Sequence, residues 1–94
     1  MPMEGYAGEL KYLTSDTLVK TGRGVLWGIY GTSNGTASLK IRDGLDVTGA
    51  IRAEFDYSNI EAGKPFALPF PKGILFDTGI FADISGQPIS LLYE

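Results

Sequence analysis

Short runs of alternating apolar and polar residues, separated by turn residues, recur along the chain. The clearest run is residues 50–57, in which apolar residues at odd positions alternate with charged residues at positions 52, 54 and 56. A spacing of two is typical of a strand with one buried face. We therefore predict a strand here, with Ile51, Ala53 and Phe55 facing the core. Comparable runs predict further strands at residues 9–13, 17–21, 74–77, 80–85 and 89–93.

Residues 24–44 contain the most apolar of these runs. Two arms of alternating residues flank a loop at 31–36 that is rich in glycine, serine, threonine and asparagine, which suit a turn. We therefore predict an antiparallel hairpin. Its first arm is apolar on both faces, as is typical of a central strand covered on each side, and this places Trp27 in the core. In the second arm the expected inward residues are Ala37, Leu39 and Ile41.

Three prolines set residues 65–71 apart from the other strands. Each proline lacks the N–H that an interior strand uses in its ladder, so the segment is expected to be an edge strand or a crossover. Lys72 and Gly73 are expected to turn the chain before the next strand. The apolar residues of the segment can still close the open side of a sandwich, and they are Phe66, Leu68 and Phe70.

The predicted elements together define an all-β fold. Eight or nine short strands with frequent turns, and no helix longer than one turn, predict a small antiparallel β-sandwich. Greek-key or jelly-roll-like connections are expected, because sequential strands are joined through a proline-rich crossover. Residues 9–94 are expected to form a single domain, and the glycine-broken residues 1–8 an N-terminal arm.

Size and charge narrow the possible partners. A domain of 94 residues buries a thin core, so association into a homo-oligomer is expected. The net charge of −3, spread without basic runs, argues against nucleic acid as a partner. No apolar stretch is long enough for a membrane span, and the first residues do not resemble a signal peptide, so no membrane partner is expected.

Candidate chemistry is sparse. The chain contains no cysteine and no histidine, which excludes disulfides, the commonest general base and the commonest zinc ligand. Asp43, Asp46 and Asp56 lie close enough in sequence to suggest a hard-cation site, but they lack the alternating ligands of a calcium loop, and turn chemistry is the simpler interpretation. We predict no catalytic residue, no cofactor and no metal. A pair of carboxylates at glycosidase separation stays an alternative, because sequence spacing does not test it.

Aromatic side chains suggest binding rather than catalysis. β-sandwich modules commonly present aromatic rings to sugars, but Trp27 lies in mid-strand and is expected in the core. Tyr6, Tyr30 and Tyr57 are better surface candidates. Their phenols suit a protein interface at least as well as a sugar.

The order of several turns and strands resembles a known group of proteins. The resemblance depends on the run from Val19 to Ile29 with its spaced glycines, the strand that ends in Asp43-Gly44, Gly79 before the penultimate strand, and a last strand that ends at Tyr93. This pattern is similar to small β-sandwich structural proteins of tailed bacteriophages, of the capsid decoration (cement) or tail accessory type. The resemblance implies a virion protein made in the host cytoplasm, with other virion proteins as partners and no catalytic residues.

The function predicted from all of this is assembly. The leading hypothesis is a non-enzymatic capsid decoration protein that binds the particle surface as an oligomer. The alternatives are a tail, neck or fibre subunit, a carbohydrate-binding module, and a small enzyme that uses carboxylates. The residues predicted for the interface are Tyr6, Leu10, Tyr12, Tyr30, Tyr57, Phe70 and Lys72.

Overall fold

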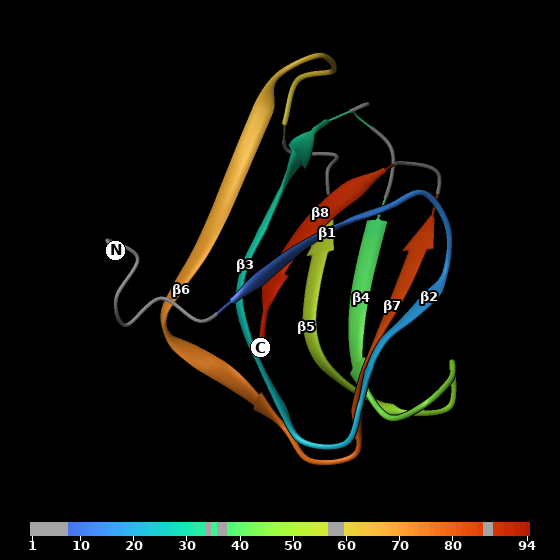
Figure 1. The fold of residues 1–94 in the computed structure, drawn as a ribbon. Coiled ribbons are helices and arrows are strands. Elements are labelled where there is room, and N and C mark those ends of the chain that lie inside the picture. Colours follow the sequence, from blue (N-terminus) through green and yellow to red (C-terminus); the bar gives the residue numbers. More distant parts are fainter. Residues whose placement is uncertain (1–7, 34, 36–37, 57–59, 86–87) are drawn as a thin grey trace.

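Two antiparallel four-stranded sheets stack face to face in the computed structural model, which describes residues 8–33, 35, 38–56, 60–85 and 88–94 (Figure 1). Sheet A contains, in spatial order, β1 (Glu9–Leu13), β8 (Ile89–Tyr93), β3 (Gly24–Thr32) and β6 (Pro65–Phe76). Sheet B contains, in the same order, β2 (Thr17–Thr21), β7 (Gly79–Ser85), β4 (Ser38–Asp43) and β5 (Ala50–Asp56). The predicted all-β sandwich is confirmed.

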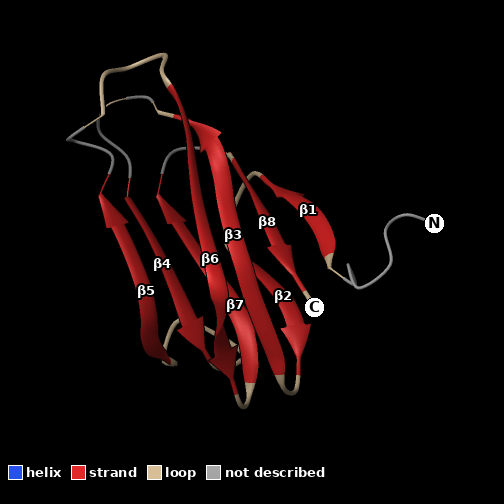
Figure 2. Cartoon of the chain, turned by 90° about the vertical axis from the view of Figure 1, so that its left-hand side faces the viewer, coloured by secondary structure: helices blue, strands red, loops and turns tan. Residues whose placement is uncertain are grey.

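The connections follow a jelly-roll path. Successive strands of the described chain change sheet at every connection except β4–β5, which stay together in sheet B (Figure 2). The strand orders are 1-8-3-6 in sheet A and 2-7-4-5 in sheet B. At each position in these orders, the strand of one sheet is consecutive in sequence with the strand of the other sheet, as in β1 and β2. Two interleaved Greek keys of this kind make the double-sheet jelly roll. The predicted Greek-key or jelly-roll-like connectivity is therefore observed.

Aliphatic side chains from both sheets fill the space between the layers. The fully buried members of this core include Leu26, Ile29, Leu39, Ile41, Phe76, Ile80, Ile89 and Leu91. The proline-rich strand β6 lies at the edge of sheet A, as predicted, and its Phe66, Leu68 and Phe70 pack partly buried against the core. Across the two sheets, the rings of Phe55 and Phe66 lie 5.3 Å apart at the β5–β6 side.

The predicted hairpin of residues 24–44 is wrong. Its arms are β3 in sheet A and β4 in sheet B, so the connection between them crosses the sandwich. Ser33 is buried at the start of this connection, and its hydroxyl donates to the carbonyl of Ile60 (3.0 Å) and accepts from the amide of Gly35 (2.9 Å). The Ser33 amide donates to the Lys64 carbonyl (2.8 Å), and its carbonyl accepts from Gly63 (2.7 Å). These bonds tie the crossing to the β5–β6 loop instead of closing a turn. Ala37, expected to face inward, lies outside the described residues.

The predicted core position of Trp27 is also wrong. The register of β3 against β6 slips between Leu26 and Gly28, so that Trp27 alone faces β6 residues 70–73. This bulge leaves Trp27 half-buried outside the core, with its indole N–H donating to Glu94 Oε1 at 2.9 Å. The expected turn at residues 72–73 is part of the same bulge within one strand, and there Gly73 adopts a φ of +72°.

A second bulge reverses the expected orientation of Ile51. The β4–β5 register shifts between Ile41 and Arg42, and this leaves Ile51 45% exposed instead of inward. The neighbouring Arg52, which was expected to face solvent, donates from its guanidinium to the Leu75 carbonyl of β6 at 2.9 Å. A bulge inserts one residue and so moves the following side chain to the other face. Arg52 thereby links the edges of the two sheets.

Asp43 connects the end of β4 to the turn between β6 and β7. Its carboxylate accepts hydrogen bonds from the backbone amides of Asp77 (3.1 Å), Thr78 (2.8 Å) and Gly79 (3.4 Å). The amide bonds from Thr78 and Asp77 lower the pKa of Asp43 below 3.8, because they stabilise the charged form. This carboxylate therefore contributes stability above pH 3.8 that is lost as the pH falls through its lowered pKa.

Replacing Asp43 with asparagine is expected to reduce the free energy of unfolding at pH 7 by about 1–2 kcal/mol, since charge-assisted hydrogen bonds become neutral ones. The difference from the wild type should shrink between pH 7 and pH 2, as the pH falls towards the lowered pKa and the wild-type carboxyl begins to take up a proton. Denaturant unfolding at both pH values measures this, with Glu54→Gln on the outer face of sheet B as the control. An equal loss at both pH values would contradict the assignment.

Candidate functional site

The outer face of sheet A carries two rows of side chains without charge. The strand register places Ser90 of β8 between Tyr12 of β1 and Tyr30 of β3, and it places Leu10 opposite Leu92. Because residues directly opposite in a sheet share a face, each row continues across all four strands. We call these eight residues the uncharged face: Tyr12, Ser90, Tyr30 and Ala67 in one row, and Leu10, Leu92, Gly28 and Pro69 in the other.

The outer face of sheet B is different. Its central row places Lys40 between Asp83 of β7 and Glu54 of β5. In the next row Arg42 pairs with Asp83 at 3.1 Å and also donates to the Gly49 carbonyl at 3.0 Å. Alternating charges of this kind are typical of a solvated sheet surface. The two outer faces of the sandwich therefore differ in chemistry, although both belong to one acidic chain.

Tyr30 and Tyr12 determine the shape of the uncharged face. The Tyr30 ring lies along its strand over Gly28, where an added Cβ would overlap the phenol oxygen. Glycine at this position is what allows the ring to lie flat on the sheet. Tyr12 is 67% exposed and Leu10 is 66% exposed. A hollow of about 230 Å³ separates the two tyrosines, with Ser90 and Pro88 on its wall.

The predicted interface residues fall into three groups. Leu10, Tyr12 and Tyr30 come from separate strands, and the fold brings them together on the uncharged face. Phe70 packs against the core, whereas Lys72 is exposed on the bulge of β6. Two further residues, Tyr6 and Tyr57, lie outside the described residues. The role of all these residues at an interface stays a prediction.

Sequence reasoning missed the members of the uncharged face on β6 and β8. Leu92, Ser90, Ala67 and Pro69 occupy ordinary alternate positions of their strands. A signal was nevertheless present, because the segment that forms β3 is apolar on both of its faces. That pattern was assigned to burial on each side, whereas the outer side of β3 is not covered by another strand of the described chain. An exposed apolar face and a buried apolar face give the same pattern of residues in the sequence.

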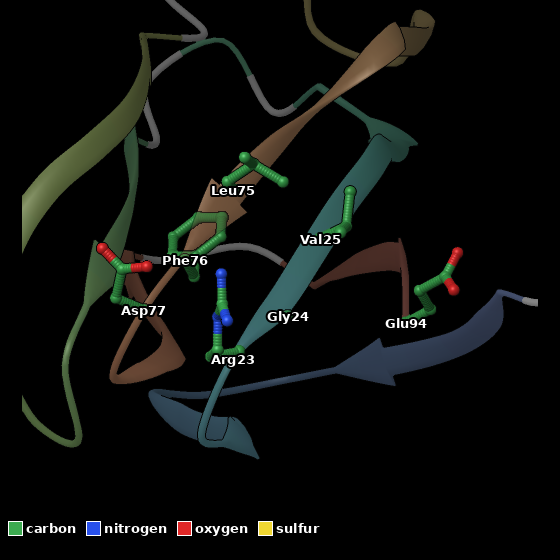
Figure 3. A pocket seen from close by; sticks show the side chains of 7 residues that line it. All are labelled: Arg23, Gly24, Val25, Leu75, Phe76, Asp77 and Glu94. Atoms are coloured by element: carbon green, nitrogen blue, oxygen red, sulfur yellow. The ribbon is translucent and has the colours of Figure 1, made fainter.

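A second hollow lies at the end of sheet A where β3 begins. It has a volume of about 300 Å³ and is lined by Val25 and Leu75, with Arg23, Asp77 and Glu94 around it (Figure 3). In this view Arg23 lies between Asp77 and Glu94. The Glu94 carboxylate is held by the Trp27 indole, and the Glu94 backbone pairs with Val25. Charged groups therefore border the apolar floor at this end of the sheet.

The acids considered for a cation site are kept apart by the fold. Asp43 and Asp56 lie at opposite ends of the β4–β5 pair, opposite Ala50 and Ser38 respectively. Asp46 accepts hydrogen bonds from the hydroxyl (2.6 Å) and amide of Thr48, and these bonds lower its pKa. Within the described ranges, no three acidic side chains gather into a group that could hold a metal ion.

Tyr93 also has a perturbed pKa. Its side chain belongs to the core layer, and burial raises its pKa above 10.0. The nearby carboxylate of Glu9 adds to the effect and accepts the Tyr93 hydroxyl proton in a hydrogen bond of 3.2 Å. The phenol is therefore held in its neutral form, which makes it a structural hydrogen-bond donor to β1.

Comparison with known proteins gives no relative. No protein-family model matches the chain, no curated protein matches it, and no solved structure matches its fold. The part of the chain that the structure describes contains no helix of the length and hydropathy needed to cross a membrane.

Gly28→Ala tests the geometry of the uncharged face. The new methyl group would overlap the Tyr30 ring, so the ring is expected to swing away while the unfolding free energy changes by less than about 1 kcal/mol, because a flexible surface side chain can yield. Nuclear Overhauser contacts between residues 28 and 30 and denaturant unfolding measure both effects. Gly73→Ala is the matched comparison and should destabilise by about 1–3 kcal/mol, since its φ is +72° and Val25 lies 2.5 Å from the new Cβ. Equal losses in the two variants would contradict this account.

Proposed function

We propose that the protein is a non-enzymatic structural component of a bacteriophage virion, and that it docks on another virion protein through the uncharged face. The particular role proposed is that of a capsid decoration protein, which covers and stabilises the particle surface. Tail, neck or fibre subunits use the same kind of contact and form the alternative within this class. Its place of action would be the virion, after synthesis in the host cytoplasm.

The observation that carries the proposal is the contrast between the two outer faces. Interface centres are depleted of charged residues and enriched in tyrosine, whereas ordinary protein surface is not. The central rows of sheet A have this composition, and Leu10 and Tyr12 present most of their side-chain area to solvent. Soluble monomers rarely expose a contiguous apolar patch without a use for it. A protein partner is therefore the simplest purpose of this surface.

The phage assignment has two supports of a different kind. The turn and strand order resembles small structural proteins of tailed phages, as described above. The jelly-roll connectivity is shared by viral capsid domains and by lectins, although a fold alone does not define a function. The acids that might have formed a catalytic or cation site are engaged in turns or lie at separate ends of the sheet. These points favour an assembly role over chemistry.

Charge placed on the uncharged face should abolish docking. Tyr12→Glu and Tyr30→Glu are each expected to weaken binding at least about tenfold, because a carboxylate would be desolvated at the centre of the interface. Binding is measured by cosedimentation with shells assembled from the major capsid protein of the same phage genome, and in parallel with its purified tails. Binding to tails alone would favour the alternative within the class.

Lys40→Glu, on the charged face of sheet B, is the matched control and should bind like the wild type. Far-UV circular dichroism and thermal unfolding establish that each variant is folded. Wild-type protein that sediments with neither shells nor tails would overturn the proposed function.

Carbohydrate binding is a second candidate, favoured by the hollow between Tyr12 and Tyr30. Its size of about 230 Å³ and its two aromatic walls suit a sugar ring, which stacks on tyrosine. In this case a glycan array probed with the wild type should give hits that Tyr30→Ala and Tyr12→Ala remove. An array without hits would eliminate the candidate and leave protein docking as the use of the face.

A further inference from the structure

Three of the four sheet edges are built in ways that oppose pairing with another strand. In β6, Pro65, Pro69 and Pro71 remove backbone donors. The edge strand β5 is bulged at its start and is tied across to β6 by Arg52. The edge strand β2 shifts register against β7 between Leu18 and Lys20. Prolines and bulges are among the means by which proteins block edges.

The fourth edge, β1, is regular. It pairs with β8 in unbroken register over all five residues, from Glu9 opposite Tyr93 to Leu13 opposite Ile89. Among the described residues no strand pairs with its other side. Two charged residues, Glu9 and Lys11, alternate with the exposed Leu10 and Tyr12. A charge on an edge strand normally discourages pairing, since the added strand would leave it without a partner.

Here the two charges have opposite signs and stand two residues apart. If two copies of β1 pair antiparallel about a twofold axis at Leu10, Glu9 of each copy lies directly opposite Lys11 of the other. Opposite charges in directly opposed positions stabilise a sheet, and like charges destabilise it. The register centred on Lys11 would instead oppose the two lysines. The charge pattern of β1 is therefore complementary to itself in one register.

The same register has a second match, on the uncharged face. It places Tyr12 of each copy opposite Gly8 of the other, while Leu10 meets Leu10. An aromatic ring over an edge glycine is a known stabilising pair in sheets. Within β3 the ring of Tyr30 also lies over a glycine, Gly28, although there both residues belong to one strand. The exposure of Tyr12, at 67%, leaves its ring available for the equivalent contact.

From these matches we infer that β1 is a self-association edge, at which a second copy of this chain adds by antiparallel β1–β1 pairing centred on Leu10. The two sheets A then form one continuous sheet, and the two uncharged faces lie side by side on it. Such an isologous contact closes as a twofold dimer and leaves no further open edge of this kind. The inference stands independently of the virion assignment, although a doubled uncharged face would serve docking on a large particle.

Charge exchange on β1 tests the register directly. The wild type is expected to show a concentration-dependent dimer in sedimentation velocity. Glu9→Lys and Lys11→Glu each create like-charged opposed pairs and should each weaken dimerisation at least about tenfold. A mixture of the two variants restores both opposite-charge pairs, so it should recover dimer that neither variant forms alone. The double variant Glu9→Lys/Lys11→Glu should dimerise like the wild type.

The mixture also protects the test from a folding artefact. Glu9→Lys removes the hydrogen bond from Tyr93, but a misfolded chain would not be rescued by mixing with Lys11→Glu. Glu54→Lys on sheet B is the control and should leave the dimer unchanged. A wild type that stays monomeric at millimolar concentration, or a dimer insensitive to these exchanges, would overturn the inference. Shell binding by the same variants is measured separately, because neither substitution lies on the uncharged face.

Discussion

Burial of one layer of aliphatic side chains between two sheets is the constraint on which the whole structure depends. Neither sheet can hide its apolar face alone, because the chain is short and has no disulfide to replace a core. The jelly-roll path solves this by sending nearly every connection across the layers. At three of these crossings, side-chain hydrogen bonds to distant backbone attach the connection, and the residues that form them are Ser33, Asp43 and Asp16. Polar contacts therefore position the sheets, while the apolar layer holds them together.

The bulges in β3 and β5 determine which residues of these two strands reach the surface. In β3 the slip beside Trp27 allows Leu26 and Ile29 both to enter the core, although they stand three residues apart. In β5 the slip turns Arg52 toward β6 and exposes Ile51. A bulge costs one ladder position but lets a strand change which face it buries. The same sequence alternation therefore has different consequences before and after each bulge.

The surface that results differs in chemistry between the two sheets. Sheet B has a charged outer face suited to solvent, while the central rows of sheet A carry tyrosine, leucine and small residues. Three edges resist pairing and one does not. An uncharged face beside a single regular edge limits where association can occur and in which orientation. This arrangement suits a protein whose work is to bind other proteins in a fixed geometry.

The local features of the fold could be predicted from the residues of each segment alone. Alternation located the strands, and the prolines of β6 predicted an edge strand because they lack donors. Leu10 and Tyr12 were predicted as surface residues from their own segment. The alternation did not predict that they share a face with residues of other strands, namely Tyr30, Leu92 and Ala67. Strand pairing, sheet membership and bulges depend on contacts between residues far apart in the chain. The sequence does not predict these features, because a period of two defines the two faces of a strand but not the elements that pack against each face.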